Sequence, residues 1–199
     1  MNPLNSVRGA IISGVIVAAV IMIAIPQGAF NEMGLMRWLH ILSGVMWIGL
    51  LWYFNVVQVP ALGAAAADKG GPGGAGITKY VAPRALLWFR WAAVATWLTG
   101  IIYLYRNQNL GNAFTFGHFG EDIHYGLVIG IGAWLGTIML FNVWVFINPN
   151  QMKVLGVVPA TDEEKVRARR VALLASRTNF VLSIPMLMCM AGATHGLPY

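Results

Sequence analysis

Four histidines are the residues of this sequence best suited to hold a cofactor. They are His40, His118, His124 and His195. Imidazole is the usual axial ligand of haem and a good ligand for copper or zinc. A haem b between helices needs one histidine from each of two helices at matching depth, and His40 and His124 meet this need in principle. His195 competes with both, whereas His118 lies in a glycine-containing loop segment.

Three residues near His40 favour a haem pocket. Arg37 precedes it by three residues on the same helical face and can pair with a haem propionate. Gly44 follows by four residues and leaves room for a flat macrocycle, and Trp47 continues the same face. The alternatives are an outer-side copper or zinc site made by the same histidines, with His118 the least suited, or histidines that simply face water and headgroups.

The composition indicates that these residues lie on helices in a lipid bilayer. The 199-residue chain is 58% hydrophobic and 10% charged, where a soluble domain has about 25% charged residues. Its long apolar runs can cover a hydrocarbon core of ~30 Å at about 1.5 Å per residue. We expect an all-α polytopic bundle, a single membrane domain over 1–199 with about five transmembrane helices. The expected spans are 10–26, 36–59, 85–105, 123–147 and 171–191, the second ending at Pro60 and the fourth before Asn148-Pro149.

The basic residues indicate the orientation of this bundle. Arg8 precedes the first span, and lysines and arginines fill the segments between the second and third spans and between the fourth and fifth. The positive-inside rule places the N-terminus in the cytoplasm, the C-terminus in the periplasm and the histidines on or near the outer side. Because the net charge of +6 gathers beside apolar spans, it indicates a bacterial inner membrane protein and not a nucleic-acid-binding protein.

Two connecting segments and one span carry further local signals. Residues 61–78 are rich in alanine and glycine, which predicts a flexible inner loop. Residues 160–170 predict a short cytoplasmic helix, with Thr161 as the cap and Glu164 three residues on. The fourth span repeats the small-residue spacing that lets membrane helices approach closely. Its glycines are Gly126, Gly130, Gly132 and Gly136.

A second polar layer is expected nearer the cytoplasmic side. It comprises Arg90, Arg177, Asn142 and Asn179. Arginines within spans are costly, and they usually face the interior of a bundle or a cavity. These four residues are therefore a candidate polar network or anion site. The alternative is that each arginine extends to the phosphate headgroups.

Three groups of residues occur in order between about residues 35 and 197. The first is Arg37-Trp-Leu-His40 with Gly44 and Trp47-Ile-Gly49, and the second is Asn142-Val-Trp144 with Asn148-Pro-Asn-Gln151. The third is Ser176-Arg-Thr-Asn179, Ser183-Ile-Pro-Met186 and His195-Gly196. Together they resemble the membrane domain of PuuD-type urate hydroxylases, the urate oxidase N-terminal domain family.

This resemblance implies a multi-span domain, usually joined to a cytochrome c, that oxidises urate to 5-hydroxyisourate and passes the electrons to a cytochrome c. It implies His40 and His195 as site residues, and Arg177 and Asn179 as parts of a family motif. The sequence contains no CxxCH motif for covalent haem, so we expect a short form without the cytochrome c domain.

We therefore expect a membrane redox protein with haem b on the outer side, exchanging electrons with a cytochrome c or a quinone. As an enzyme it would be a membrane-bound oxidoreductase that binds urate or another small anion near arginines. The alternative is a cofactor-free accessory subunit of a larger respiratory or energy-converting membrane complex, since its small-residue helix faces favour packing. A transporter is less favoured because the expected spans contain no Asp or Glu for ion coupling.

Overall fold

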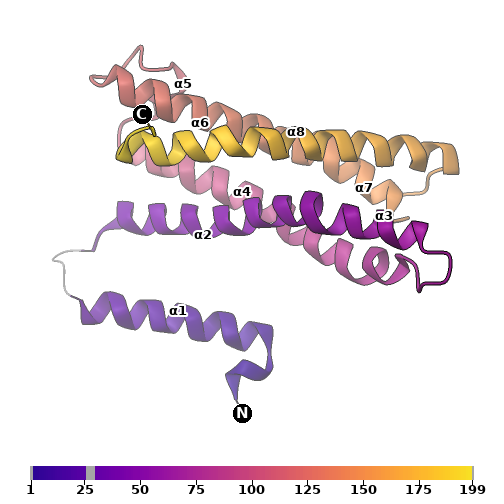
Figure 1. Cartoon of the computed structure of the whole chain (residues 1–199). Coiled ribbons are helices and arrows are strands. Elements are labelled where there is room, and N and C mark those ends of the chain that lie inside the picture. Colours follow the sequence, from indigo (N-terminus) through magenta and orange to yellow (C-terminus); the bar gives the residue numbers. More distant parts are fainter. Residues whose placement is uncertain (1, 26–29, 199) are drawn as a thin grey trace. The chain divides into compact units, whose positions relative to one another are not determined.

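The computed structural model describes residues 2–25 and 30–198 of the chain. The chain divides into two compact units, Met1–Glu32 and Met33–Tyr199, where we expected one domain. The described residues form helices and no strand, and five stretches of helix are long and apolar enough to cross a membrane (Figure 1). The expectation of an all-α polytopic membrane protein is therefore confirmed, whereas the orientation of its termini stays a prediction.

The first unit consists of a short 3-10 turn, η1 (Pro3–Asn5), and the apolar helix α1 (Val7–Ala24). Ser6 caps α1, because its hydroxyl accepts a 3.0 Å hydrogen bond from the Gly9 backbone N–H. The helix begins earlier than the expected span 10–26, and residue 26 lies outside the described residues. No residue of α1 is buried, so its side chains are all available to lipid.

The second unit contains four long helical stretches. Its elements are α2 (Glu32–Trp52), η2 (Tyr53–Gln58), α3 (Val59–Ala67), η3 (Ile77–Val81), α4 (Ala82–Arg106), α5 (Leu110–Phe114), α6 (Ile123–Asn142), η4 (Val143–Ile147), α7 (Asn148–Val154) and α8 (Asp162–His195). α6 and α8 run side by side (Figure 1). Each stretch exceeds the ~20 residues needed to cross the hydrocarbon core, so its ends can extend beyond that core.

Three of these stretches continue through a proline in the same way. Pro60, Pro83 and Pro149 each lie two residues after a π-helical segment, which is η2, η3 or η4. In an α-helix, a proline ring clashes with the carbonyl four residues earlier. Here the residue before the proline donates to the carbonyl five residues back, as Val59 does to Phe54, and the wider turn accommodates the ring. The helices therefore continue past Pro60 and Pro149, where the sequence predicted that the second and fourth spans end.

The segment expected to be a flexible loop, 61–78, is helical at both ends. α3 continues to Ala67, because alanine has the highest helix propensity. Asp68 then ends the helix in an extended conformation, and helical structure resumes at residue 75. Only the short glycine-rich segment between these two points is not helical, and it connects α3 to η3.

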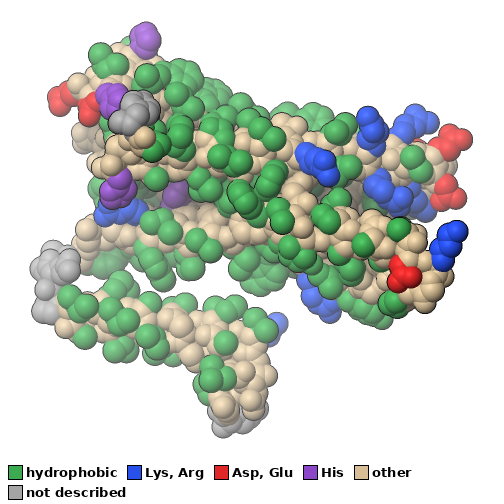
Figure 2. All heavy atoms as spheres, viewed as in Figure 1, with side chains coloured by type: hydrophobic (Ala, Val, Ile, Leu, Met, Phe, Trp, Pro, Cys, Tyr) green, Lys and Arg blue, Asp and Glu red, His purple; other side chains and the backbone are tan. Residues whose placement is uncertain are grey.

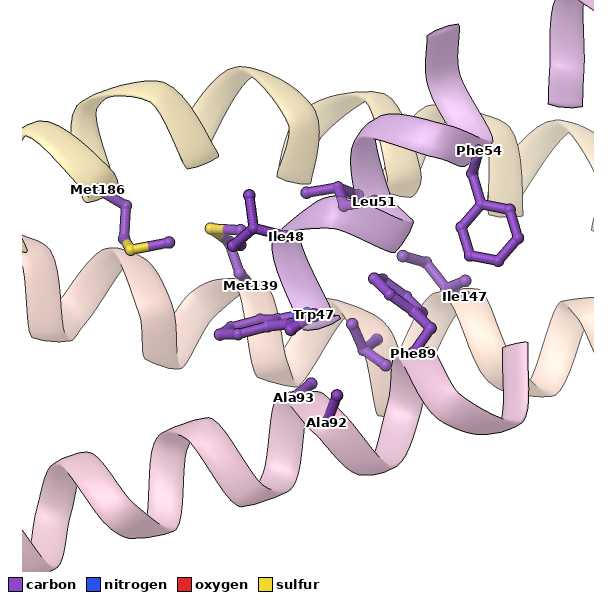
Figure 3. Packing of buried hydrophobic residues seen from close by; sticks show 11 residues of the cluster. Trp47, Ile48, Leu51, Phe54, Phe89, Ala92, Ala93, Met139, Ile147 and Met186 are labelled. Carbon is purple, nitrogen blue, oxygen red and sulfur yellow. The ribbon is translucent and has the colours of Figure 1, made fainter. Parts of the chain in front are cut away.

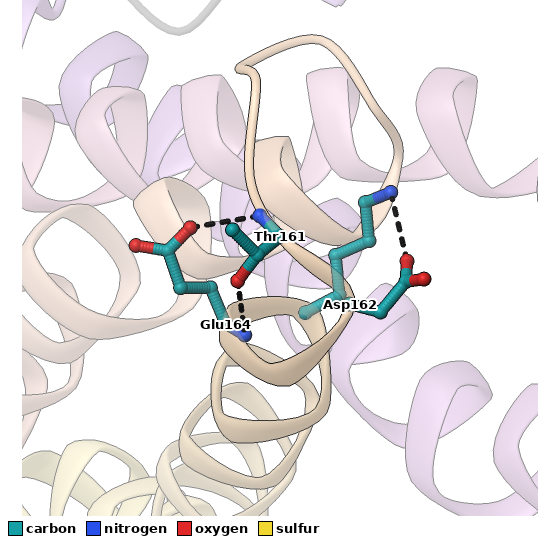
Figure 4. Close-up of polar contacts among 4 residues, drawn as sticks. Thr161, Asp162 and Glu164 are labelled. Carbon is teal, nitrogen blue, oxygen red and sulfur yellow. Dashed lines mark hydrogen bonds and ion pairs between the residues drawn. The ribbon is translucent and has the colours of Figure 1, made fainter.

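α8 begins with the cap expected from the sequence. The Thr161 hydroxyl accepts a 3.2 Å hydrogen bond from the Glu164 N–H, and the Glu164 carboxylate accepts a 2.8 Å bond from the Thr161 N–H (Figure 4). This reciprocal capping box is confirmed. The helix it starts is not short, however, because no glycine or proline interrupts the chain between Asp162 and Ile184. The helix expected to be cytoplasmic and the expected fifth span are one continuous helix.

The core lies where α2, α4, α6 and α8 meet. Figure 3 shows Trp47 and Leu51 of α2 facing Phe89 of α4, Met139 of α6 and Met186 of α8. Each of these five side chains is at least nine-tenths buried. Because every long helix of the second unit contributes, the core fixes their mutual positions.

The glycines of α6 permit close contact with two different partners. A Cβ at Gly126 or Gly130 would overlap the Asn112 side-chain amide or the Ala113 carbonyl oxygen of α5. A Cβ at Gly132 would lie 3.3 Å from Cys189 of α8. The expected close approach is therefore found within the chain, on two sides of one helix.

Gly130→Ala should lower the thermal unfolding temperature of the protein in detergent, because the added methyl meets the backbone of α5 and overpacking costs about 1–3 kcal/mol. Gly136→Ala is the matched control, since a Cβ there has no neighbour within 4 Å. Alanine should be neutral or stabilising at that position. Equal unfolding temperatures for the two variants would contradict the assigned packing.

Candidate functional site

The histidines lie toward one end of the second unit. α2 and α6 begin at this end, and α4 and α8 finish there (Figure 1). Figure 2 shows histidine side chains grouped at this end, while most lysines and arginines gather at the opposite end. We call these the histidine end and the basic end. The separation agrees with the one-sided histidine arrangement expected from the sequence.

His40 is the histidine that the fold holds in a defined orientation. It is half-buried on α2, and its Nδ1 lies 2.7 Å from the Thr96 carbonyl oxygen of α4. A carbonyl only accepts hydrogen bonds, so Nδ1 carries the proton and Nε2 keeps its lone pair. A Cβ at Gly100 would lie 2.9 Å from the His40 ring, so glycine is what allows the ring to lie against α4. A histidine that ligates a metal through Nε2 usually has its Nδ1 proton bonded in this way to a carbonyl oxygen.

The other residues expected around His40 have different surroundings. Arg37 is exposed, one turn closer to the histidine end, where it can meet an anionic group. A Cβ at Gly44 would lie 3.7 Å from the Thr96 methyl group, so Thr96 occupies part of the space that we expected for a macrocycle. Trp47 is 2% exposed and belongs to the core. Gly44 and Trp47 therefore serve the packing of α2.

His124 and His195 each lie near the end of a helix at the histidine end. Trp97 of α4 donates a 2.9 Å hydrogen bond to Thr137 of α6. His40 bonds to the residue of α4 next to Trp97, so Thr137 approximately marks the height of His40 along α6. His124 is thirteen residues before Thr137, which is about 20 Å along a helix. On α8, Cys189 lies beside Gly132 of α6. His195 follows Cys189, and counting residues along α6 and then along α8 places it roughly 15 Å from the level of Thr137. Neither histidine shares the depth of His40.

The remaining histidine and the metal alternative can be placed as well. His118 is exposed in the loop between α5 and α6, with its Nδ1 3.1 Å from the Thr115 carbonyl oxygen. His124 and His195 are exposed too. Within the described ranges, no three His, Cys, Asp or Glu side chains come together in a way that could hold a metal ion.

The expected polar layer contains a row of hydrogen bonds along α8. Asn179 is fully buried: its amide donates 2.9 Å to the Met139 carbonyl, and its oxygen accepts 2.9 Å from Asn142. One turn away, Asn55 donates 3.0 Å to Ser176. One turn beyond Asn179 in the other direction, Ser183 accepts 3.2 Å from Trp52. We call Ser176, Asn179 and Ser183 the α8 seam.

The two arginines of the expected layer differ from each other. Arg90 is half-buried and donates 2.9 Å to the Asn148 side-chain oxygen. Its Nε has no partner, and neither has the Gln58 side-chain oxygen. Arg177 is exposed on α8 and takes no part in the seam. Arg90 therefore pairs with an asparagine across two helices, whereas Arg177 faces outward.

Sequence reasoning missed several residues that make these contacts. It did not single out Trp52, Thr96, Gly100 and Thr137, and it named Asn148, Ser176 and Ser183 only as parts of the family resemblance. The seam could have been found, because positions 176, 179 and 183 follow the spacing of one helix face. The role of Thr96 could not, because its backbone carbonyl makes the contact and any residue type supplies one.

Asn179→Ala should destabilise the protein by about 1–2 kcal/mol, since it removes two interhelical hydrogen bonds and leaves the half-buried Asn142 amide without its Asn179 partner. Thr178→Ala is the control, an exposed neighbour on the same helix. Reversible unfolding in mixed micelles measures both. Similar stabilities for the two variants would show that the seam contributes nothing.

Comparison with known proteins bears on the C-terminal part of the chain, which contains the seam. Residues 122–199 match the family model described as urate oxidase N-terminal. No curated protein matches the chain, and no solved structure does. The matched residues contain α6, α7 and α8, with Asn142, Asn179, His124 and His195. The block around His40 lies outside the match. The resemblance drawn from the sequence is thus confirmed for residues 122–199, which are similar to the urate oxidase N-terminal family.

Proposed function

We propose that this chain is the membrane domain of an oxidoreductase related to urate oxidation, with a haem b-type site centred on His40. The observation that supports this most is the 2.7 Å hydrogen bond from His40 Nδ1 to the Thr96 carbonyl. It fixes the tautomer and leaves the Nε2 lone pair with which His40 would hold the iron. Arg37, one turn toward the histidine end, is suited to a propionate. His40 and Arg37 would thus supply a ligand and a counter-charge for a haem, while Thr96 fills part of the space beside Gly44.

The chemistry of urate oxidation explains why such a group would be useful. Conversion of urate to 5-hydroxyisourate consumes one water and releases two electrons and two protons. Haem b, when bound, supplies a carrier that takes up one electron at a time. The residues of this chain orient its ligand through Thr96, and the apolar helices exclude water from the ring of His40. The electrons then pass to a cytochrome c or a quinone.

The charge distribution supports a direction for this reaction. Lysines and arginines gather at the basic end (Figure 2), and in a bacterial inner membrane such residues face the cytoplasm. The histidine end then faces the periplasm. Substrate and cytochrome c would both be met on that side, where small hydrophilic molecules are accessible.

Purified native protein should show a b-type band in reduced-minus-oxidised absorption spectra. His40→Ala should lose the band, because it removes the ligand. His124→Ala and His195→Ala should keep it, since both residues lie about 15–20 Å from the level of His40 along the helices. Elemental analysis separates the alternatives: copper or zinc without iron would favour a metal site, and a colourless protein that co-purifies in a complex would favour an accessory subunit.

Gly100→Ala should weaken haem binding about tenfold and shift the haem band, because its methyl displaces the His40 ring. Gly49→Ala is the matched control on α2, where a Cβ has no neighbour within 4 Å. Titration of haem into each purified apoprotein measures the affinity. If Gly100→Ala bound haem as wild type does, the position of the ring would have no bearing on the cofactor.

A further inference from the structure

One face of α8 is exposed along most of the helix and carries two arginines. Residues that recur every three or four positions lie on one side of an α-helix. Six residues of α8 with this spacing are all exposed, and we call them the α8 outer face: Arg170, Leu174, Arg177, Val181, Ile184 and Met188. Asn179 and Ser183 of the α8 seam are fully buried, so the seam and the outer face are different sides of the helix.

Neither arginine of this face has a hydrogen-bond or ion-pair partner in the part of the chain that the structure describes. The three acids of α8 lie in its first turn, where two form ion pairs with Lys165 and Arg167 and the third completes the capping box. The sequence contains no Asp or Glu after Glu164. Arg170 and Arg177 are therefore available to an anionic group that is not part of the chain.

Arg177 lies about one hydrocarbon thickness from the far end of α8. His195, the last residue of the helix, follows Arg177 by eighteen residues, which is about 27 Å of helix. The hydrocarbon core of a bilayer is ~30 Å thick. If His195 lies at one boundary of the core, Arg177 lies close to the other. Its side chain points toward the N-terminus of the helix, which is the direction of the headgroups at the basic end.

The rest of the outer face is apolar and suits the acyl chains of a lipid. Val181, Ile184 and Met188 are all exposed. Met188 follows Arg177 by eleven residues, which is about 16 Å of helix and about half the thickness of the core. A lipid of one leaflet whose phosphate lies at Arg177 therefore has its chains along these three residues.

Arg170 adds a second positive charge on the headgroup side. It precedes Arg177 by seven residues, about 10 Å along the helix, so it lies among the headgroups. A cation in that layer attracts an anionic headgroup and repels the ammonium group of a zwitterionic one. The charges of the face are thus complementary to a phospholipid with net negative charge.

We propose that the α8 outer face binds an anionic phospholipid of the leaflet at the basic end. Its phosphate lies on Arg177, and its acyl chains lie along Val181, Ile184 and Met188. Arg170 selects headgroups that carry net negative charge. The site involves neither His40 nor the α8 seam, so it does not depend on the proposed haem function.

Native mass spectrometry of the full chain, released from detergent micelles with added lipid, tests this proposal. The probes are phosphatidylglycerol, which is anionic, and phosphatidylcholine with the same acyl chains, which is zwitterionic. Wild type should bind phosphatidylglycerol roughly tenfold more tightly or better, because two arginines contribute. Equal affinities for the two lipids would overturn the proposal.

Single variants locate the site on α8. Arg177→Gln and Arg170→Gln should each weaken phosphatidylglycerol binding about fivefold, the usual effect of removing one basic residue near an anionic headgroup. Arg167→Gln is the matched control, because it removes the same charge from the same helix at a residue already paired with Glu163. It should bind as wild type does. A comparable loss in Arg167→Gln would show attraction to the overall charge and would refute the assigned face.

Two further outcomes distinguish other occupants of this face. A large excess of glycerol phosphate, the headgroup without acyl chains, should not displace phosphatidylglycerol, because the chains hold the lipid beside α8. Full displacement would indicate a site for any phosphate and would contradict the lipid assignment. A dimer in the mass spectra that Arg177→Gln abolishes would assign the face to a second copy of this chain instead.

Discussion

The absence of hydrogen-bonding partners in lipid governs the arrangement of this protein. Polar side chains on membrane helices must satisfy one another or remain unpaired at a cost. The α8 seam meets this requirement: Ser176, Asn179 and Ser183 pair with side chains of α2, η2 and α6. Since α2 and α6 both bond to the same face of α8, this helix is the centre about which the others pack. The apolar core then fills the space between them.

α4 is attached by a separate set of contacts, and these lie at different depths. Arg90 bonds to Asn148 toward the basic end. Nearer the histidine end, Trp97 bonds to Thr137 and the neighbouring Thr96 carbonyl bonds to His40. These bonds orient the helix along much of its length. The His40 tautomer is therefore a consequence of how α4 packs.

The π-helical segments reconcile long helices with prolines. Each widened turn comes just before a proline, so the chain keeps its direction where an α-helix would kink or end. Wider turns also shift the register of nearby side chains. Asn55 and Gln58 belong to η2, and Asn142 immediately precedes η4. Several polar residues of the interior are thus presented by segments that depart from α-helical geometry.

The sequence by itself determined that the chain is suited to a lipid bilayer and that its fold is all-α. It also determined the number of stretches able to cross a membrane and the capping box at Thr161. These follow from composition and local spacing, which the chain carries without reference to other segments. It also identified Asn142 and Asn179 as polar residues that need partners, and a family resemblance that residues 122–199 bear out. It did not determine where helices end, because the effect of Pro60 depends on the turn that precedes it.

Only the tertiary structure decided which polar residues meet. Depth along a helix can be estimated from sequence, but the axial offset between two helices depends on side-chain packing. The matching depth expected for His40 and His124 depends on that offset, and α4 bonds to α6 at Thr137, thirteen residues after His124. Thr96 acts through its backbone carbonyl, and Gly100 acts by having no side chain. Neither role leaves a signal in residue type, because each exists only when α2 and α4 are packed together.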